Sequence, residues 1–229
     1  MSSKFIYAQS YLQFIENKGQ WDEKIKFKSD ISSGSFALYP TGYRVMMSNT
    51  DDLRKAGELI HGDSHEKDIT ARFKQKDSNV TIRSHAYEVK FLNSNPNPVI
   101  IPEKIISTYN NYFIGNDANK WASNCKIYTA VTYKNVYPNI DVRYYTDNNN
   151  LKYDIIVNPG GDAAKIILYF DGVDDLKTKD GNLIIKTSVD DVRELAPYTY
   201  QLSKTGKKDV PCSYDVRGNI VRFKTEGIL

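Results

Sequence analysis

Two histidines, four positions apart, come closest to a metal-binding pattern. His61 and His65 flank Gly62-Asp63-Ser64, and a helix through this segment would place both imidazoles on one face, where they could share a metal ion. Gly62 weakens a helix at this point. We therefore expect a solvated loop and no bound metal, with His61 and His65 as the candidate ligands should a metal bind.

Clusters of Asp and Asn raise the possibility of calcium binding. They occur at residues 147–150, 171–175 and 190–191, and carboxylate and amide oxygens are the ligands that calcium takes in extracellular β modules. None of the clusters has EF-hand spacing, and Asp and Asn are also the residues that β-turns favour. We expect turns at these places and no cofactor, with calcium as the alternative.

Motifs for enzymatic catalysis are absent from the chain. The sequence contains no G-x-S-x-G nucleophile elbow, no phosphate-binding G-x-x-x-x-G-K-[ST] loop and no dinucleotide fingerprint. A carboxylate pair for glycoside hydrolysis stays open, because the separation that it needs is spatial and not sequential. We expect a protein that is not an enzyme, with a glycan hydrolase as one alternative.

Aromatic side chains suggest a second alternative, a carbohydrate-binding module. Flat aromatic faces stack on sugar rings, and Trp21, Trp121 and Tyr145 are the candidate ligand-binding residues. Aromatic residues at alternating strand positions more often fill a core. Among the tyrosines, Tyr145 is expected to be exposed because its neighbour Tyr144 faces inward.

The elements that would position these residues are mostly β-strands. The chain is rich in β-formers, with 17 Tyr and 9 Phe, and apolar and polar residues alternate over residues 140–144 and 151–157 on either side of an Asp-Asn turn, which predicts a hairpin. Further strands are predicted at residues 24–28, 35–39, 43–47, 84–92, 166–170, 182–187, 198–202, 210–216 and 220–224.

One polar segment interrupts the strands at residues 51–79. Leu53, Ala56 and Ile60 have helical spacing behind the acidic start at Asp51-Asp52, which predicts one short helix. We expect an all-β fold with antiparallel β-sandwich architecture in two packed lobes. The first lobe spans residues 12–108 and includes the insertion, and the second spans residues 109–229.

Charge and hydropathy exclude two classes of partner. The 31 basic and 28 acidic residues leave a net charge of +3 and are interspersed, so we expect no nucleic-acid partner. No run approaches the roughly 18 apolar residues of a membrane span, so we expect no membrane insertion. Cys125 and Cys212 are the only cysteines. A disulfide and two buried thiols are equally open for them.

Several phrases taken together resemble a known family. They are FIENKGQWDEKIKF, HAYEVKFLNSNPNP, YNNYFIGNDANKW, YTAVTYKNVYPNIDVRYY and LKYDIIVNPGGD. In this order they resemble the N-terminal domain of unknown function found in large secreted bacterial proteins, whose members continue into SBBP beta-propeller repeats or PKD-like domains and often a gliding-motility-associated C-terminal sorting domain. The resemblance covers roughly residues 12 to 226.

The resemblance implies a secreted or cell-surface protein, although the N-terminus has no apolar secretion signal. It also implies partners among downstream domains of the same polypeptide, extracellular polysaccharide or other surface proteins, and it implies no reaction. Export into an oxidising compartment predicts that Cys125 and Cys212 are bonded. We therefore expect a non-catalytic module that acts as a scaffold or an adhesion-type interaction domain.

Overall fold

The computed structural model describes residues 13–31, 33–61, 81–147 and 150–226. Within these residues it has seventeen β-strands, one α-helix and two short 3-10 helices, and all strand pairs are antiparallel. The expected all-β fold is confirmed.

The strands follow one another along the chain with short connections. They are β1 (Phe14–Glu16), β2 (Phe27–Ile31), β3 (Gly34–Tyr39), β4 (Gly42–Ser48), β5 (Ser84–Phe91), β6 (Val99–Tyr112), β7 (Ala122–Tyr137), β8 (Ile140–Asp147), β9 (Asn150–Val157), β10 (Ile167–Asp171), β11 (Asp175–Lys179), β12 (Asn182–Lys186), β13 (Val192–Glu194), β14 (Thr199–Ser203), β15 (Gly206–Val210), β16 (Cys212–Arg217) and β17 (Ile220–Thr225).

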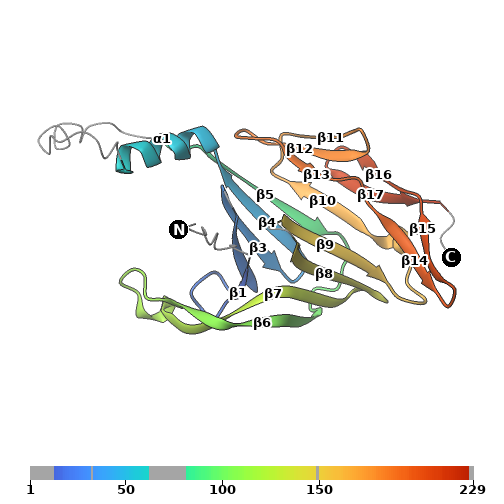
Figure 1. Ribbon diagram of the computed structural model, residues 1–229, viewed down its shortest axis with the longest axis horizontal. Helices are drawn as coiled ribbons and strands as arrows, with labels where there is room; N and C mark the ends of the chain where they lie inside the picture. Colours follow the sequence, from blue (N-terminus) through green and yellow to red (C-terminus); the bar gives the residue numbers. More distant parts are fainter. Residues whose placement is uncertain (1–12, 32, 62–80, 148–149, 227–229) are drawn as a thin grey trace, which may run out of the picture.

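One large sheet of twelve strands dominates the molecule (Figure 1). Its order is β16-β17-β10-β5-β4-β3-β2-β1-β7-β8-β9, and β6 pairs with β7 beside this path. The neighbours β10 and β5, and β1 and β7, come from distant parts of the chain. The sheet is therefore assembled from both halves of the sequence. Its strands do not follow the expected division into residues 12–108 and 109–229, whose boundary falls inside β6.

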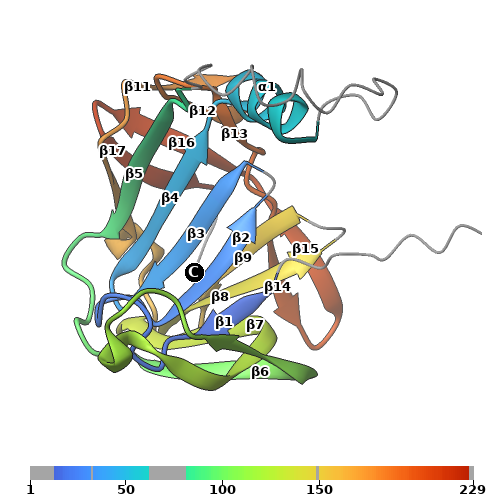
Figure 2. The same cartoon turned by 90° about the vertical axis from the view of Figure 1, so that its left-hand side faces the viewer.

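The large sheet bends around its own core. Figure 2 shows β3 and β4 on one side of the molecule and β8 and β9 crossing on the other. The ring of Tyr144 on β8 packs against Phe36 on β3 and Tyr43 on β4, with centroids 6.1 and 6.2 Å apart. All three residues are buried. Strand alternation sends these aromatics inward because successive side chains point to opposite faces.

Two small sheets complete the fold. Strands β11, β12 and β13 form one of them, and Leu183 and Ile185 on β12 are fully buried in the main core cluster. This sheet therefore covers the core. Strands β14 and β15 form the other, a hairpin that pairs with no other strand among the described residues. The hairpin lies at the opposite end of the molecule from the helix (Figure 1).

The predicted helix is present as α1 (Thr50–His61). The Asn49 side-chain oxygen accepts the Asp52 backbone N–H at its start, a capping contact. Asp52 also accepts two hydrogen bonds from the Arg83 guanidinium, at 2.8 and 3.0 Å. These hydrogen bonds from Arg83 lower the pKa of Asp52 to about 2. The pairing ties the start of the helix to the segment just before β5.

Local patterning predicts the β8–β9 hairpin well and predicts the small sheet of β11, β12 and β13 poorly. The hairpin of β8 and β9 forms in the expected register, with Ile140, Val142 and Tyr144 buried. Strand β2 begins three residues later than its alternation suggested. Strands β1, β6, β7 and β15 were not among the predicted strands. Strands β11 and β13 were also not predicted, because both are short, carry many charges and take their place in the structure from their pairing with β12.

Candidate functional site

A shallow groove of about 310 Å³ opens on the outer face of the large sheet. Its walls come from the segment before β2, the β3–β4 turn and the adjoining parts of β4 and β5. Backbones meet closely at its floor, since a Cβ at position 42 would lie 2.0 Å from the Val89 carbonyl oxygen and Gly42 is required there. The lining residues are Asp22, Lys24, Ile25, Tyr39, Pro40, Thr41, Gly42, Arg44, Glu88, Val89 and Lys90.

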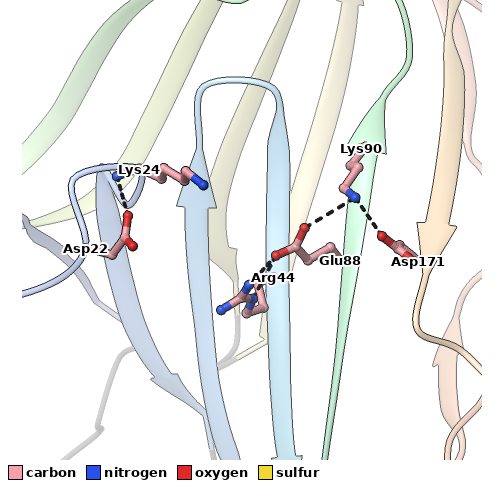
Figure 3. A network of polar contacts seen from close by, with 6 residues as sticks. All are labelled: Asp22, Lys24, Arg44, Glu88, Lys90 and Asp171. Carbon is pink, nitrogen blue, oxygen red and sulfur yellow. Dashed lines mark hydrogen bonds and ion pairs between the residues drawn. The ribbon is translucent and has the colours of Figure 1, made fainter.

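A chain of ion pairs crosses this face (Figure 3). Arg44 and Asp171 are the register partners of Glu88 on its two sides, so two carboxylates stand directly opposite each other on adjacent strands. Such a like-charge pair is destabilising unless cations neutralise it. The Arg44 Nε donates to Glu88 at 2.9 Å, and the Lys90 ammonium lies 2.6 Å from Asp171 and 3.6 Å from Glu88.

The Glu88–Asp171 pair sets two carboxylates side by side, which is the feature that a glycan hydrolase would need. Both carboxylates lie on an outer sheet face, and each is engaged by a cation. Charge balance across β4, β5 and β10 accounts for the whole network.

Lys24 also lines the groove, and its ammonium forms no ion pair with any described residue.

A second polar site lies beside the core, where the partly buried Glu194 on β13 meets the buried Tyr43 and the partly buried Tyr153. Its two carboxylate oxygens accept hydrogen bonds from the Tyr43 hydroxyl at 3.3 Å and from the Tyr153 hydroxyl at 3.1 Å. These tyrosines come from β4 and β9, on opposite sides of the core. The carboxylate therefore joins three strands that are far apart in the sequence.

Burial dominates the electrostatics around Glu194. Desolvation raises the pKa of its carboxyl group, although the two hydroxyl donors oppose the shift. Burial, followed by the nearby Glu194 charge, raises the pKa of Tyr43 and Tyr153 well above the ordinary value, and that of Tyr144 as well. The phenols therefore stay protonated and serve as donors.

A third feature is an exposed apolar strip along β6 and its connection to β7. Strand β6 pairs only with β7 among the described residues, so its other edge is open. Exposed fractions reach 64% at Val99, 60% at Ile105 and 75% at Ile114. The apolar strip comprises Val99, Ile101, Ile105, Tyr109, Phe113, Ile114 and Trp121.

Comparison with known proteins identifies the family. The model of a domain of unknown function, DUF7948, matches residues 14–228. The chain belongs to this family. No curated protein and no solved structure matches the chain. The DUF7948 match covers nearly all described residues, so every surface above lies within the family domain.

The three predicted aromatic ligand residues of this DUF7948 domain lie in different surroundings. Trp21 is partly buried, and its ring packs edge-on against Tyr112 at 5.2 Å. Trp121 is 46% exposed and packs against Phe113, its indole N–H donating to the Gly115 carbonyl at 3.1 Å. Both tryptophans therefore contact the end of the β6–β7 hairpin.

Tyr145 lies elsewhere, on the outer face of β8. Its hydroxyl donates to Asp154 at 3.2 Å and the Arg143 guanidinium lies 5.1 Å from its ring centroid. Tyr145 is partly buried rather than fully exposed. It contacts strand neighbours and neither of the tryptophans, so the three residues form no single described platform.

Sequence reasoning missed Glu194 and the exposed tyrosines Tyr198 and Tyr200. Glu194 stands alone in a short charged strand, and nothing local reveals the two phenols that reach it. Tyr198 and Tyr200 did carry a signal, since they alternate in a predicted strand whose other residues are mostly polar. Both are exposed, at 66% and 45%.

The structure does not form the disulfide that export predicts. Cys125 and Cys212 are free thiols. Cys125 is buried on β7 with Ile15, Ala122 and Ile127, and Cys212 begins β16. Burial raises the pKa of the Cys125 thiol, which suits a packing residue rather than a nucleophile.

The predicted metal ligands lie at or beyond the end of α1. His61 is the last residue of the helix, and His65 falls outside the described residues. Within the described ranges, no three His, Cys, Asp or Glu side chains come together as a metal site. In the same part of the chain, every helix is too short or too polar to reach across a bilayer.

Proposed function

We propose that this domain is a non-catalytic interaction module of a larger secreted or cell-surface bacterial protein. In this proposal the apolar strip docks neighbouring domains of the same polypeptide. Those neighbours are SBBP beta-propeller repeats or PKD-like domains, and a gliding-motility-associated sorting domain ends the protein. The observation that carries the proposal is the exposure of the strip, because an apolar surface of this length marks interaction sites on soluble proteins.

Features of β6 favour docking through side chains over addition of a further strand. Pro102 has no N–H to donate, and Lys104 adopts a positive φ of 54°. The ladder to β7 shifts register between Ile105 and Tyr109. Proline, lysine and bulges are the devices that keep an edge strand from pairing with another chain. The exposed side chains remain available while the edge is blunted.

Hydrogen exchange tests this proposal. The domain alone would be compared with a longer polypeptide in which it is followed by its downstream domains. We expect slower exchange over residues 99–121 in the longer polypeptide, and loss of this protection in an Ile101→Lys variant. Ile156→Lys is the matched control, because Ile156 is similarly exposed, at 39%, on β9. Equal exchange over residues 99–121 in both polypeptides would show that the strip docks no downstream domain.

Carbohydrate binding is the second candidate, and the exposure of Trp121 favours it. An indole face open to solvent can stack on a sugar ring. We expect a gel that contains a neutral polysaccharide to retard the native domain during electrophoresis. The Trp121→Ala variant should migrate without this retardation. Ile114→Ala, which removes a nearby exposed apolar side chain, serves as the control. Retardation that survives Trp121→Ala would remove Trp121 from consideration.

A further inference from the structure

The hairpin of β14 and β15 carries a cationic aromatic cluster on one face. Tyr200 and Leu202 alternate along β14 and therefore share a face, and Tyr198 immediately precedes the strand with the same alternation. The Lys207 ammonium lies 4.5 Å from the Tyr198 centroid and 3.9 Å from the Tyr200 centroid. Leu202 is the register partner of Lys207 and is 78% exposed. We call these four residues the hairpin platform.

We propose that the hairpin platform is a binding site for an acidic polysaccharide, with a sugar carboxylate paired to the Lys207 ammonium. This site is separate from the apolar strip and from Trp21, Trp121 and Tyr145. In this proposal the carbohydrate binds to residues that the sequence did not indicate as ligand-binding candidates.

Charge selects an anionic ligand. Lys204, Lys207 and Lys208 lie at or beside the hairpin turn, and none forms an ion pair with a described residue. Lys208 is the register partner of Gln201 and therefore faces away from the platform. The nearest acid on the same face, Asp209, already accepts a hydrogen bond from the Tyr198 hydroxyl at 2.8 Å. The Lys207 ammonium lies over two ring faces, whose quadrupoles attract it. A hydrogen bond with the Tyr198 side chain, and after it the charges of Tyr198, Tyr200 and Asp209, raise the pKa of Lys207, so one acid faces this cluster of lysines.

Ring geometry selects a sugar chain. The Tyr198 and Tyr200 centroids are 5.8 Å apart with a tilt of 42°, a spacing close to one residue of an extended saccharide. The C–H faces of sugars pack on aromatic rings and on an exposed Leu, while the ammonium pairs with the carboxylate. On the opposite face, Val210 at the end of β15 is buried and packs the base of the hairpin against the rest of the protein.

Affinity electrophoresis with polygalacturonate, using dextran as the neutral polymer, tests the site. We expect retardation by polygalacturonate alone, weakened at least about threefold in dissociation constant by Lys207→Met, as for the loss of an exposed ion pair. Tyr200→Ala should weaken it further. Lys177→Met is the matched control, since Lys177 is an exposed lysine on β11, and it should bind like the native domain. Circular dichroism would confirm that each variant is folded.

Three outcomes would overturn the proposal. They are no retardation by polygalacturonate, equal retardation by dextran, and retardation that Lys207→Met leaves unchanged. Co-sedimentation with vesicles of phosphatidylglycerol but no retardation by polygalacturonate would assign the platform to a membrane surface instead. Hydrogen exchange over β6 reports on different residues, so either proposal can fail alone.

Discussion

Tyrosines inside the large sheet and tyrosines on the terminal hairpin use opposite ends of the same side chain. Beside the core, the buried Tyr43 and the partly buried Tyr153 donate hydrogen bonds from their hydroxyls to Glu194. On the hairpin, Tyr198 and Tyr200 hold the Lys207 ammonium with their ring faces. Most buried hydroxyls in proteins are hydrogen-bonded to a protein group, whereas an exposed hydroxyl is hydrated by water. The interior should therefore be sensitive to polar atoms, and the hairpin to ring faces and charge.

Removing the carboxylate should have the largest effect on stability. Glu194→Ala leaves the Tyr43 and Tyr153 hydroxyls without their acceptor, and we expect a loss of about 2–4 kcal/mol in the free energy of unfolding. Urea denaturation measures it. Glu23→Ala, at an exposed glutamate, is the control and should change stability by less than about 0.5 kcal/mol. Equal effects of the two substitutions would show that the interior network is not holding β13.

Stability should also depend on pH through Glu194. Burial raises the pKa of its carboxyl group above the unfolded value. Its contribution is therefore complete below about pH 4.5 and is lost as pH rises through the folded-state pKa. Glu194→Gln does not titrate. We expect the native domain to lose stability relative to Glu194→Gln as pH rises from about 4 to 8. Urea unfolding at several pH values measures the difference.

The carboxyls with lowered pKa values, Asp52, Glu103 and Asp141, titrate alike in the native domain and in Glu194→Gln. Their contributions therefore cancel in the difference in unfolding free energy between the native domain and Glu194→Gln. A difference that is constant over the whole pH range would mean that Glu194 has an ordinary pKa.

Removing a single tyrosine hydroxyl should change stability by different amounts at two positions in the core. Tyr153→Phe removes a donor to Glu194 and should cost about 1–2 kcal/mol. Tyr133→Phe is its counterpart, because the buried Tyr133 hydroxyl has no hydrogen-bond partner among the residues that the structure describes. Its removal should leave stability unchanged or raise it by up to about 1 kcal/mol. Thermal unfolding measures the stability of both variants. Equal effects of the two substitutions would contradict the prediction, since they would show that ring packing, which both variants keep, decides stability.

The smallest stability effect is expected on the hairpin. Tyr200→Ala should change the free energy of unfolding by less than about 0.5 kcal/mol, since the ring is exposed and the hairpin pairs with no other sheet in the described part of the chain. The same substitution should weaken polygalacturonate binding. A large loss of stability would show that the hairpin supports the core, and the contrast between the two regions would fail.

Local sequence signals were sufficient for much of the fold and for little of the candidate sites. Alternation placed Ile140, Val142 and Tyr144 inward, and helical spacing behind Asp51 and Asp52 predicted α1. These are properties of neighbouring residues. The Glu88–Asp171 opposition and its bridging lysine depend on β5 pairing with β10, about eighty residues away. No periodicity reports such a pairing.

By itself the sequence determined an all-β domain with one short helix and with inward faces on its hairpins, because side-chain alternation and turn chemistry act between neighbours. Only the tertiary structure decided that one sheet draws strands from both halves, that Glu194 lies between Tyr43 and Tyr153, and that Lys207 rests on two tyrosines. Strand order and burial arise from contacts between residues far apart in the chain. The same residue type, tyrosine, therefore became a buried donor in one region and an exposed platform in the other.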